Sequence, residues 1–138
     1  MAVGFTVKYY WYQIGTGDFL HSFFSTIAYN LEDKQWGTKY PVIMNELYSG
    51  KLDKEHLVQA MNELNMITQE LKQFSCDRAI WDIDDLSKSI PWGDNISADI
   101  TDLSNYYVTS DGEDLISMLR HAMEKAIELK TDLCISTL

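Results

Sequence analysis

Apolar and polar positions alternate along the first dozen residues of the chain. The odd positions carry the larger apolar side chains: Val3, Phe5, Val7, Tyr9 and Trp11. A period of two is typical of a half-buried β-strand, and β-branched and aromatic residues favour that conformation. We therefore predict one N-terminal strand, Val3–Tyr12, which ends before Gly15 and Gly17.

The period changes to that of a helix after Gly17. Asp18 suits the N-cap of a helix over about Phe19–Leu31, and Pro41 suits the first turn of a short helix that ends at Tyr48. Asp53 then caps a third helix, whose apolar residues recur at helical spacing: Leu57, Ala60, Met61, Leu64, Ile67, Leu71 and Phe74. This repeat is the strongest secondary-structure signal in the chain.

The residue pattern in the middle of the chain predicts a strand on either side of a loop. Ala79–Ile83 has the composition of a short strand, and Tyr106–Thr109 has that of another. Between them, the polar stretch Asp84–Asp102 contains Pro91 and Gly93. We expect it to form a long ordered loop.

A capping box begins the last predicted helix. Ser110 is its N-cap, Glu113 follows three residues later, and apolar residues from Leu115 to Ile127 have helical spacing. Asp132–Ser136 is the closing strand. The order β-α-α-α-β-β-α-β predicts an α+β fold, with a small mixed or antiparallel sheet of about four strands and helices packed on one face.

Length and composition fit a single globular domain over residues 1–138. Hydrophobic residues make up 46% of the chain, which excludes global disorder. The N-terminal residues lack the basic and apolar regions of a signal peptide, and no apolar run reaches the ~18 residues that span a bilayer. Cys76 and Cys134 are far apart in the sequence, so we expect two reduced thiols in a cytoplasmic protein.

The negative charge is concentrated in one part of the chain. Residues 77–114 contain two bases, Arg78 and Lys88, and ten acids: Asp77, Asp82, Asp84, Asp85, Asp94, Asp99, Asp102, Asp111, Glu113 and Asp114. Their net charge of −8 is four-fifths of the −10 of the whole chain. Such a segment repels nucleic acid and anionic membrane surfaces, and it favours a cation or a basic partner.

The clustered carboxylates raise a second hypothesis, a small metal-dependent enzyme. Asp82, Asp84 and Asp94 offer the oxygen ligands that Mg²⁺ or Ca²⁺ prefers, but the EF-hand pattern is absent. In a strand, Asp82 and Asp84 would share one face and Asp85 would lie on the other. This arrangement favours a solvated or partner-facing edge over a dedicated metal site.

Each of the three histidines, His21, His56 and His121, lies in a predicted helix without a ligand-type residue at i+4. A zinc site or acid–base catalysis there would need another histidine, cysteine or acid brought close by the fold. Ordinary helix positions are the favoured interpretation. We accordingly expect no cofactor.

Large aromatic residues accompany the acidic segment. Trp11 and Trp81 fall in predicted strands and are expected in the core. Trp92 lies in the predicted loop, where its ring either packs under the loop or contacts a partner. Because tryptophan and tyrosine are enriched among interface anchors, Trp92, Tyr106 and Tyr107 are our candidates for that role.

Four segments carry a resemblance to a known family: Tyr10–Phe24, Asn45–Leu52, Pro91–Ser97 and Thr101–Gly112. Together they resemble the immunity protein 70 family, and the similarity runs from near the N-terminus to about residue 120. The resemblance implies an immunity protein of a bacterial polymorphic-toxin system. Such a protein protects its own cell by binding the C-terminal domain of a cognate toxin.

Charge and resemblance lead to one hypothesis, a non-enzymatic inhibitor that binds a basic, nuclease-like toxin domain through an acidic surface centred on residues 82–102. The expected contact residues are carboxylates, one amide and aromatic rings: Asp82, Asp84, Asp85, Trp92, Asp94, Asn95, Asp99, Asp102, Tyr106 and Tyr107. A metal-dependent enzyme and a structural subunit of a larger assembly are the alternatives. The oligomeric state stays open.

Overall fold

The computed structural model describes residues 2–93 and 95–138. It contains a four-stranded sheet in the order β2-β1-β4-β3, in which every pair of neighbours is antiparallel. The strands are β1 (Val3–Val7), β2 (Tyr10–Gly15), β3 (Lys51–Leu52) and β4 (Leu133–Thr137). The predicted α+β class is confirmed, and β4 lies within one residue of the predicted closing strand.

The first two strands form a tight hairpin, so the prediction of one continuous strand to Tyr12 is wrong. Val7 pairs with Tyr10, and between them Lys8 adopts a left-handed φ of 51°. The alternation of apolar and polar residues continues from β1 through the turn into β2. Lys8 and Tyr9 are also not among the glycine, asparagine and aspartate residues that usually form such turns, so the turn leaves no signal in the sequence.

The helices lie close to their predicted places. They are α1 (Gly17–Leu31), the π-helix η1 (Val42–Leu47), α2 (Leu57–Leu71) and α3 (Leu115–Leu129), with short 3₁₀ turns at η2 (Lys54–His56) and η3 (Cys76–Arg78). Asp53, predicted to cap the third helix, instead caps the 3₁₀ turn η2 that precedes α2, by accepting the backbone N–H of Glu55 at 2.8 Å; α2 itself has His56 at its N-cap, without a side-chain bond.

Two other predicted caps are displaced by a few residues. Thr16, not Asp18, caps α1, and Asp114, not Ser110, caps α3; each accepts a backbone N–H three residues further on, at 3.1 and 3.0 Å. Serine, threonine and aspartate are all strongly preferred at the N-cap. Because several of them precede each helix, the residue type alone does not select the cap.

The predicted strands Ala79–Ile83 and Tyr106–Thr109 are absent from the sheet, and this prediction is wrong. Val108 forms an isolated bridge with Asp114, and the first segment has no strand pairing. Tyr106 and Tyr107 belong to the core and Ala79 and Ile83 pack against it, whereas Val108 is exposed. Trp81, which the sequence predicted in the core, is only partly buried. Aromatic and β-branched residues favour buried positions, and these occur in ordered loops as well as in strands. The composition of these segments therefore does not distinguish a strand from a packed loop.

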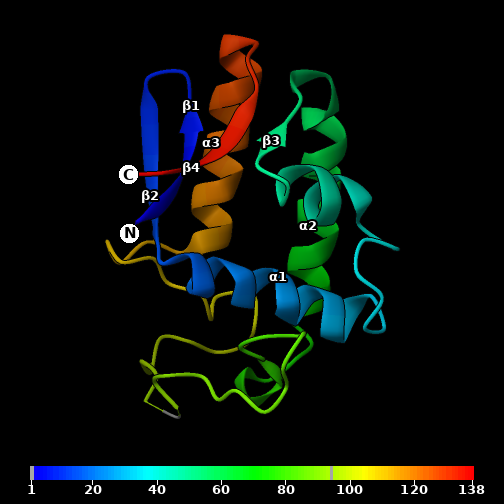
Figure 1. Ribbon diagram of the computed structural model, residues 1–138, viewed down its shortest axis with the longest axis vertical. Helices are drawn as coiled ribbons and strands as arrows, with labels where there is room; N and C mark the ends of the chain where they lie inside the picture. The colour runs from blue at the N-terminus through cyan, green and yellow to red at the C-terminus, as the bar shows by residue number, and fades with distance from the viewer. Residues whose placement is uncertain (1, 94) are drawn as a thin grey trace.

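One face of the sheet is covered by α3, which contacts β1, β2 and β4, and α2 packs on α3. Figure 1 shows α1 crossing the lower end of this assembly, with a long irregular segment below it. The core contains large side chains from the strands and helices, among them Phe5, Phe23, Phe24, Ile43 and Leu64. Within residues 2–93 and 95–138, no helix is long and apolar enough to cross a membrane.

Candidate interaction face

The segment below α1 holds most of the acidic residues singled out above, and we call residues 75–109 the acidic loop. It is drawn in green to yellow in Figure 1, and it consists of η3 followed by successive turns. A buried backbone group without a hydrogen-bond partner costs free energy. A loop outside the sheet therefore needs other groups to satisfy its N–H and C=O groups.

A stripe of small hydroxyl side chains on α1 supplies these partners. Ser22, Ser25 and Thr26 are fully buried. Ser22 donates to the carbonyl oxygen of Ile80 at 2.7 Å, and Thr26 accepts from the N–H of Ile80 at 3.0 Å. Ser25 accepts from the N–H of Ile83 at 3.2 Å. The extended segment of the acidic loop thus pairs with a helix face rather than with another strand.

Tyr107 attaches the far end of the acidic loop to the same stripe. Its hydroxyl donates to the carbonyl oxygen of Ser22 at 3.1 Å and lies 2.6 Å from Oγ1 of Thr26. Burial raises the pKa of Tyr107 above its ordinary value, against the opposing hydrogen bonds from Ser22 and Thr26. Tyr106 and Tyr107 are 5% and 2% exposed, so these two expected anchors lie under the surface.

Trp92 is half-buried and remains beside open space. Its Nε1 donates to the hydroxyl of Tyr106 at 2.8 Å, and its ring centroid lies 5.7 Å from that of Trp81. A groove of about 610 Å³ opens beside these two indole rings. Its other wall includes Ile14, Thr16, Asp18 and Phe19, from the end of β2 and the start of α1.

Three of the expected contact residues hold the acidic loop in shape. Asp82 accepts the N–H of Asp84 at 2.9 Å, and Asp85 accepts the N–H of Ser87 at 3.2 Å. Asp102 accepts the N–H of Ser104 at 2.8 Å. Side chains that bond the backbone two residues on form the turns that irregular segments need. These carboxylates therefore have a structural role as well as a charge.

The same bonds lower the pKa of these three aspartates. The pKa of Asp82 is lowered chiefly by the N–H of Asp84, with His21 and Lys88 adding to an effect that burial opposes. Hydrogen bonds from Ser87 lower the pKa of Asp85. For Asp102, burial acts to raise the pKa, but hydrogen bonds from Ser104 and Thr101 outweigh it and the pKa is lowered.

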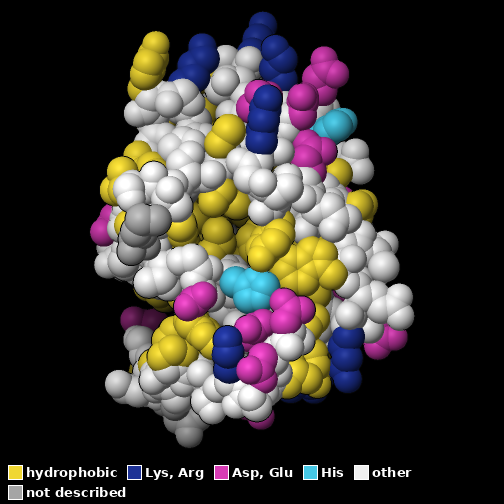
Figure 2. Space-filling model, in the orientation of Figure 1, with side chains coloured by type: hydrophobic (Ala, Val, Ile, Leu, Met, Phe, Trp, Pro, Cys, Tyr) yellow, Lys and Arg dark blue, Asp and Glu magenta, His cyan; other side chains and the backbone are white. Residues whose placement is uncertain are grey.

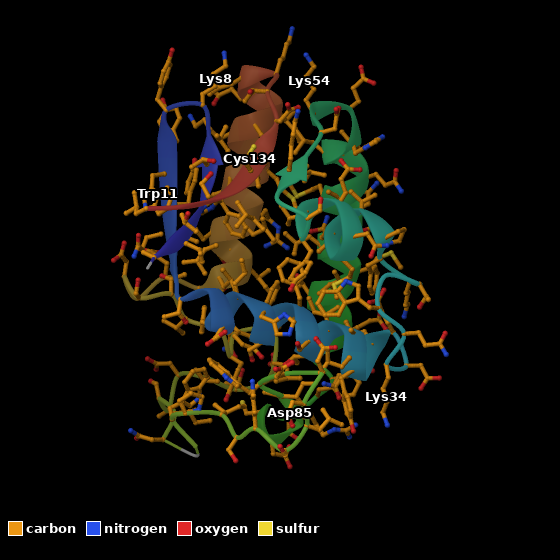
Figure 3. All side chains as sticks on the ribbon, in the orientation of Figure 1. Lys8, Trp11, Lys34, Lys54, Asp85 and Cys134 are labelled. Atoms are coloured by element: carbon orange, nitrogen blue, oxygen red, sulfur yellow. The ribbon has the colours of Figure 1, made fainter. Side chains whose placement is uncertain are left out.

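The other expected residues that the structure describes are exposed. The Asp84 side chain is 84% exposed, Asn95 and Asp99 are also exposed, and Asp94 lies outside the described residues. From residue 79 to residue 109 the sequence contains six acids and one base, Lys88, whose Nζ lies 3.4 Å from Oδ2 of Asp82. Figure 3 labels Asp85 on this segment below α1. Figure 2 shows acidic side chains gathered there.

His21 belongs to this face, although its sequence position gave no sign of it. Its Nε2 lies 3.2 Å from Oδ1 of Asp82 and 3.9 Å from Oδ2 of Asp84. The hydroxyl of Tyr48 lies 2.9 Å from Nδ1, and Trp36 stacks on the imidazole with the ring centroids 5.9 Å apart. Asp82 lies 61 residues after His21 in the sequence, and the fold brings the two side chains together. A search for ligand-type residues four positions along the same helix cannot detect such a partner.

The face therefore combines exposed carboxylates of the acidic loop, the imidazole of His21 on α1, and an aromatic groove between the acidic loop and the start of α1. A basic protein surface could find there both charge complementarity and apolar contact area.

Comparison with known proteins identifies the family. A family model described as Immunity protein 70 matches residues 5–135. No curated protein and no solved structure gives a significant match. The family match covers nearly the whole chain, including both the sheet and the acidic loop. The chain therefore belongs to the Immunity protein 70 family, which makes it an immunity protein of a toxin system whose partner is a cognate toxin protein.

Proposed function

We propose that this immunity protein neutralises the C-terminal domain of a polymorphic toxin by covering a basic surface of that domain with the acidic loop. The observation that carries the proposal is the exposure of Asp84, Asp85 and Asp99 on a segment whose residues 79–109 contain six acids and one base, Lys88. Carboxylates that are solvated in the free protein remain available to a cationic partner. The family assignment favours inhibition by binding, without catalysis by this chain.

The charge of the acidic loop favours a nuclease-like toxin. An enzyme that acts on nucleic acid presents a basic face to the phosphate backbone. A protein with net charge −10 and a local concentration of acids would be steered toward that face, which raises the association rate. The same field repels nucleic acid and anionic lipid, so the proposed partner is a basic protein surface. We place this encounter in the cytoplasm as part of the proposal.

Affinity also needs contacts that exclude water, and Trp92 with its groove supplies them. A partly exposed indole beside a concave apolar surface is a typical interface anchor. We propose the contact set as Asp82, Asp84, Asp85, Trp92, Asp94, Asn95, Asp99 and Asp102. Tyr106 and Tyr107 support this set from below, because their rings pack beneath Trp92 and Phe19.

A survival assay tests the proposal. Cells that express the toxin domain encoded beside this gene should grow when they also express the wild-type protein. The double variant Asp84→Lys/Asp99→Lys should lose that protection. The control Glu55→Lys/Glu124→Lys changes the charge by the same amount at exposed positions outside the acidic loop and should protect as the wild type does. Equal protection by both variants would refute the proposed face.

A further inference from the structure

The imidazole of His21 faces two carboxylates at distances that suit metal coordination. Its Nε2 is 3.2 Å from Asp82 Oδ1 and 3.9 Å from Asp84 Oδ2, and the three ligand atoms all lie within 4.8 Å of one another. In a tetrahedral zinc site with bonds of about 2.0–2.1 Å, ligand atoms are about 3.3 Å apart. We propose that His21, Asp82 and Asp84 bind one divalent transition-metal ion, with Zn²⁺ the best fit.

The surroundings of His21 hold its ring in the orientation that such a site needs. Tyr48 Oη lies 2.9 Å from Nδ1, and the ring stacks on Trp36 with an interplanar angle of 21°. When Nδ1 carries the proton and donates it to Tyr48, Nε2 presents its lone pair to the space between the carboxylates. Metal-ligating histidines are generally oriented in this way through the other ring nitrogen.

The charges around the cluster are also compatible with a divalent cation. Lys88 lies against Oδ2 of Asp82, at 3.4 Å, and Oδ1, which also accepts the N–H of Asp84 at 2.9 Å, is directed at His21. The Asp84 side chain is 84% exposed, so an ion can reach the site from solvent and its fourth ligand can be water. The two carboxylates of Asp82 and Asp84 offset the charge of the ion, and Lys88 adds one positive charge on the far oxygen of Asp82.

The mixed ligand set predicts which ions bind. Imidazole suits zinc, copper, iron and nickel, whereas Mg²⁺ and Ca²⁺ prefer six or more oxygen ligands. The site differs from the aspartate set that the sequence offered, because it contains His21 and does not require Asp94. It concerns the free protein and does not depend on the identity of the toxin.

Titration of the purified, metal-stripped full chain with ZnCl₂ tests this proposal by calorimetry, with CoCl₂ as an optical probe of geometry. We expect one ion per chain and the visible absorption of tetrahedral cobalt. Asp84→Asn and His21→Gln should each weaken zinc binding by about tenfold or more, since even loss of an outer-shell partner costs about 10–100-fold. MgCl₂ should give no saturable heat.

His56→Gln is the matched control, because His56 pairs with a single carboxylate, Glu46, at 2.8 Å. It should bind zinc as the wild type does. Absence of saturable zinc and cobalt binding in the wild type would overturn the proposal, as would equal weakening by His56→Gln. Asp84→Asn decides the matter if His21→Gln fails to fold, because the exposed Asp84 side chain contributes little to stability.

Discussion

Acidic side chains serve opposite purposes in two regions of this molecule. Beside the helices of the core, Glu32 and Glu63 are 3% and 8% exposed. In the acidic loop, Asp84 and Asp99 project into solvent. The first pair can be buried only because backbone N–H groups surround it. Location and hydrogen-bond supply therefore decide which acids contribute to the external field of the protein.

The buried pair organises the chain between α1 and α2. Glu32 accepts the N–H groups of Gly37, Lys39 and Tyr40, each at 2.9 Å. Glu63 accepts those of Val42 and Ile43 at the start of η1, at 3.2 and 2.8 Å. The bonds of Glu63 replace the intrahelical acceptors that the first N–H groups of η1 lack, and those of Glu32 satisfy N–H groups of the loop before it. Because both carboxylates are buried and bonded to backbone N–H groups, they are not accessible to a partner.

Removing the buried carboxylate of Glu32 should produce the largest loss of stability. Glu32→Ala is expected to lower the free energy of unfolding by roughly 3–5 kcal/mol, because each buried N–H left without an acceptor costs about 1–3 kcal/mol. Urea denaturation measures the change. Asp99→Asn in the acidic loop is the matched control and should stay within about 0.5 kcal/mol of the wild type. Equal effects of the two substitutions would abolish the distinction between the regions.

The junction between the regions should show an intermediate effect. Tyr107→Phe removes the hydroxyl that bonds Ser22 and Thr26, and it should cost about 1–2 kcal/mol. Hydrogen exchange should rise at the N–H groups of Ile80 and Ile83 while α2 and α3 stay protected. Tyr9→Phe, at a position 97% exposed, is the control and should be neutral. Unchanged exchange in Tyr107→Phe would show that α1 does not hold the loop through this hydroxyl.

The pH dependence of stability offers a finer test at Glu63. Burial raises its pKa above the ordinary 4.5, against the N–H groups of Ile43 and Val42. The folded state then binds this proton more tightly than the unfolded state, so the contribution of Glu63 to stability falls as pH rises from 4.5 through the raised folded pKa.

Glu63→Gln does not titrate. Its free energy of unfolding relative to the wild type should therefore rise with pH across that window and level off above it. Urea denaturation over a pH series measures this difference. A difference independent of pH would contradict the assignment of Glu63 as a carboxyl whose protonation folding favours.

The sequence predicted regular elements well where one periodicity ran without interruption. The apolar repeat from Leu57 to Leu71 gave α2, and the last strand was predicted within one residue. The prediction was wrong where a reversal or a non-strand partner intervened. Lys8 turns the chain without a turn residue, and Ile80 pairs with hydroxyl groups of a helix. The pattern of apolar and polar residues along a segment contains no information on the turn at Lys8 or on the bonds between Ile80 and α1.

The candidate site shows the same limit. The acidity of the loop could be predicted, because charge is a property of composition. The burial of Tyr106 and Tyr107 could not, because an aromatic next to a loop is equally suited to a core and to an interface. The approach of His21 to Asp82 depends on how the loop docks on α1, and spacing within a single helix cannot anticipate it.

The association rate of the protein with its toxin domain, measured by stopped flow over a range of salt concentrations, tests the central claim most directly. At low salt, Asp84→Lys/Asp99→Lys should associate about tenfold or more slowly than the wild type, with a flatter salt dependence, because steering raises association rates by about 10–10³-fold. Glu55→Lys/Glu124→Lys, with the same change in net charge, should stay close to the wild-type rate. If both pairs slow association equally, net charge alone accounts for the attraction, and the acidic loop is not the docking face.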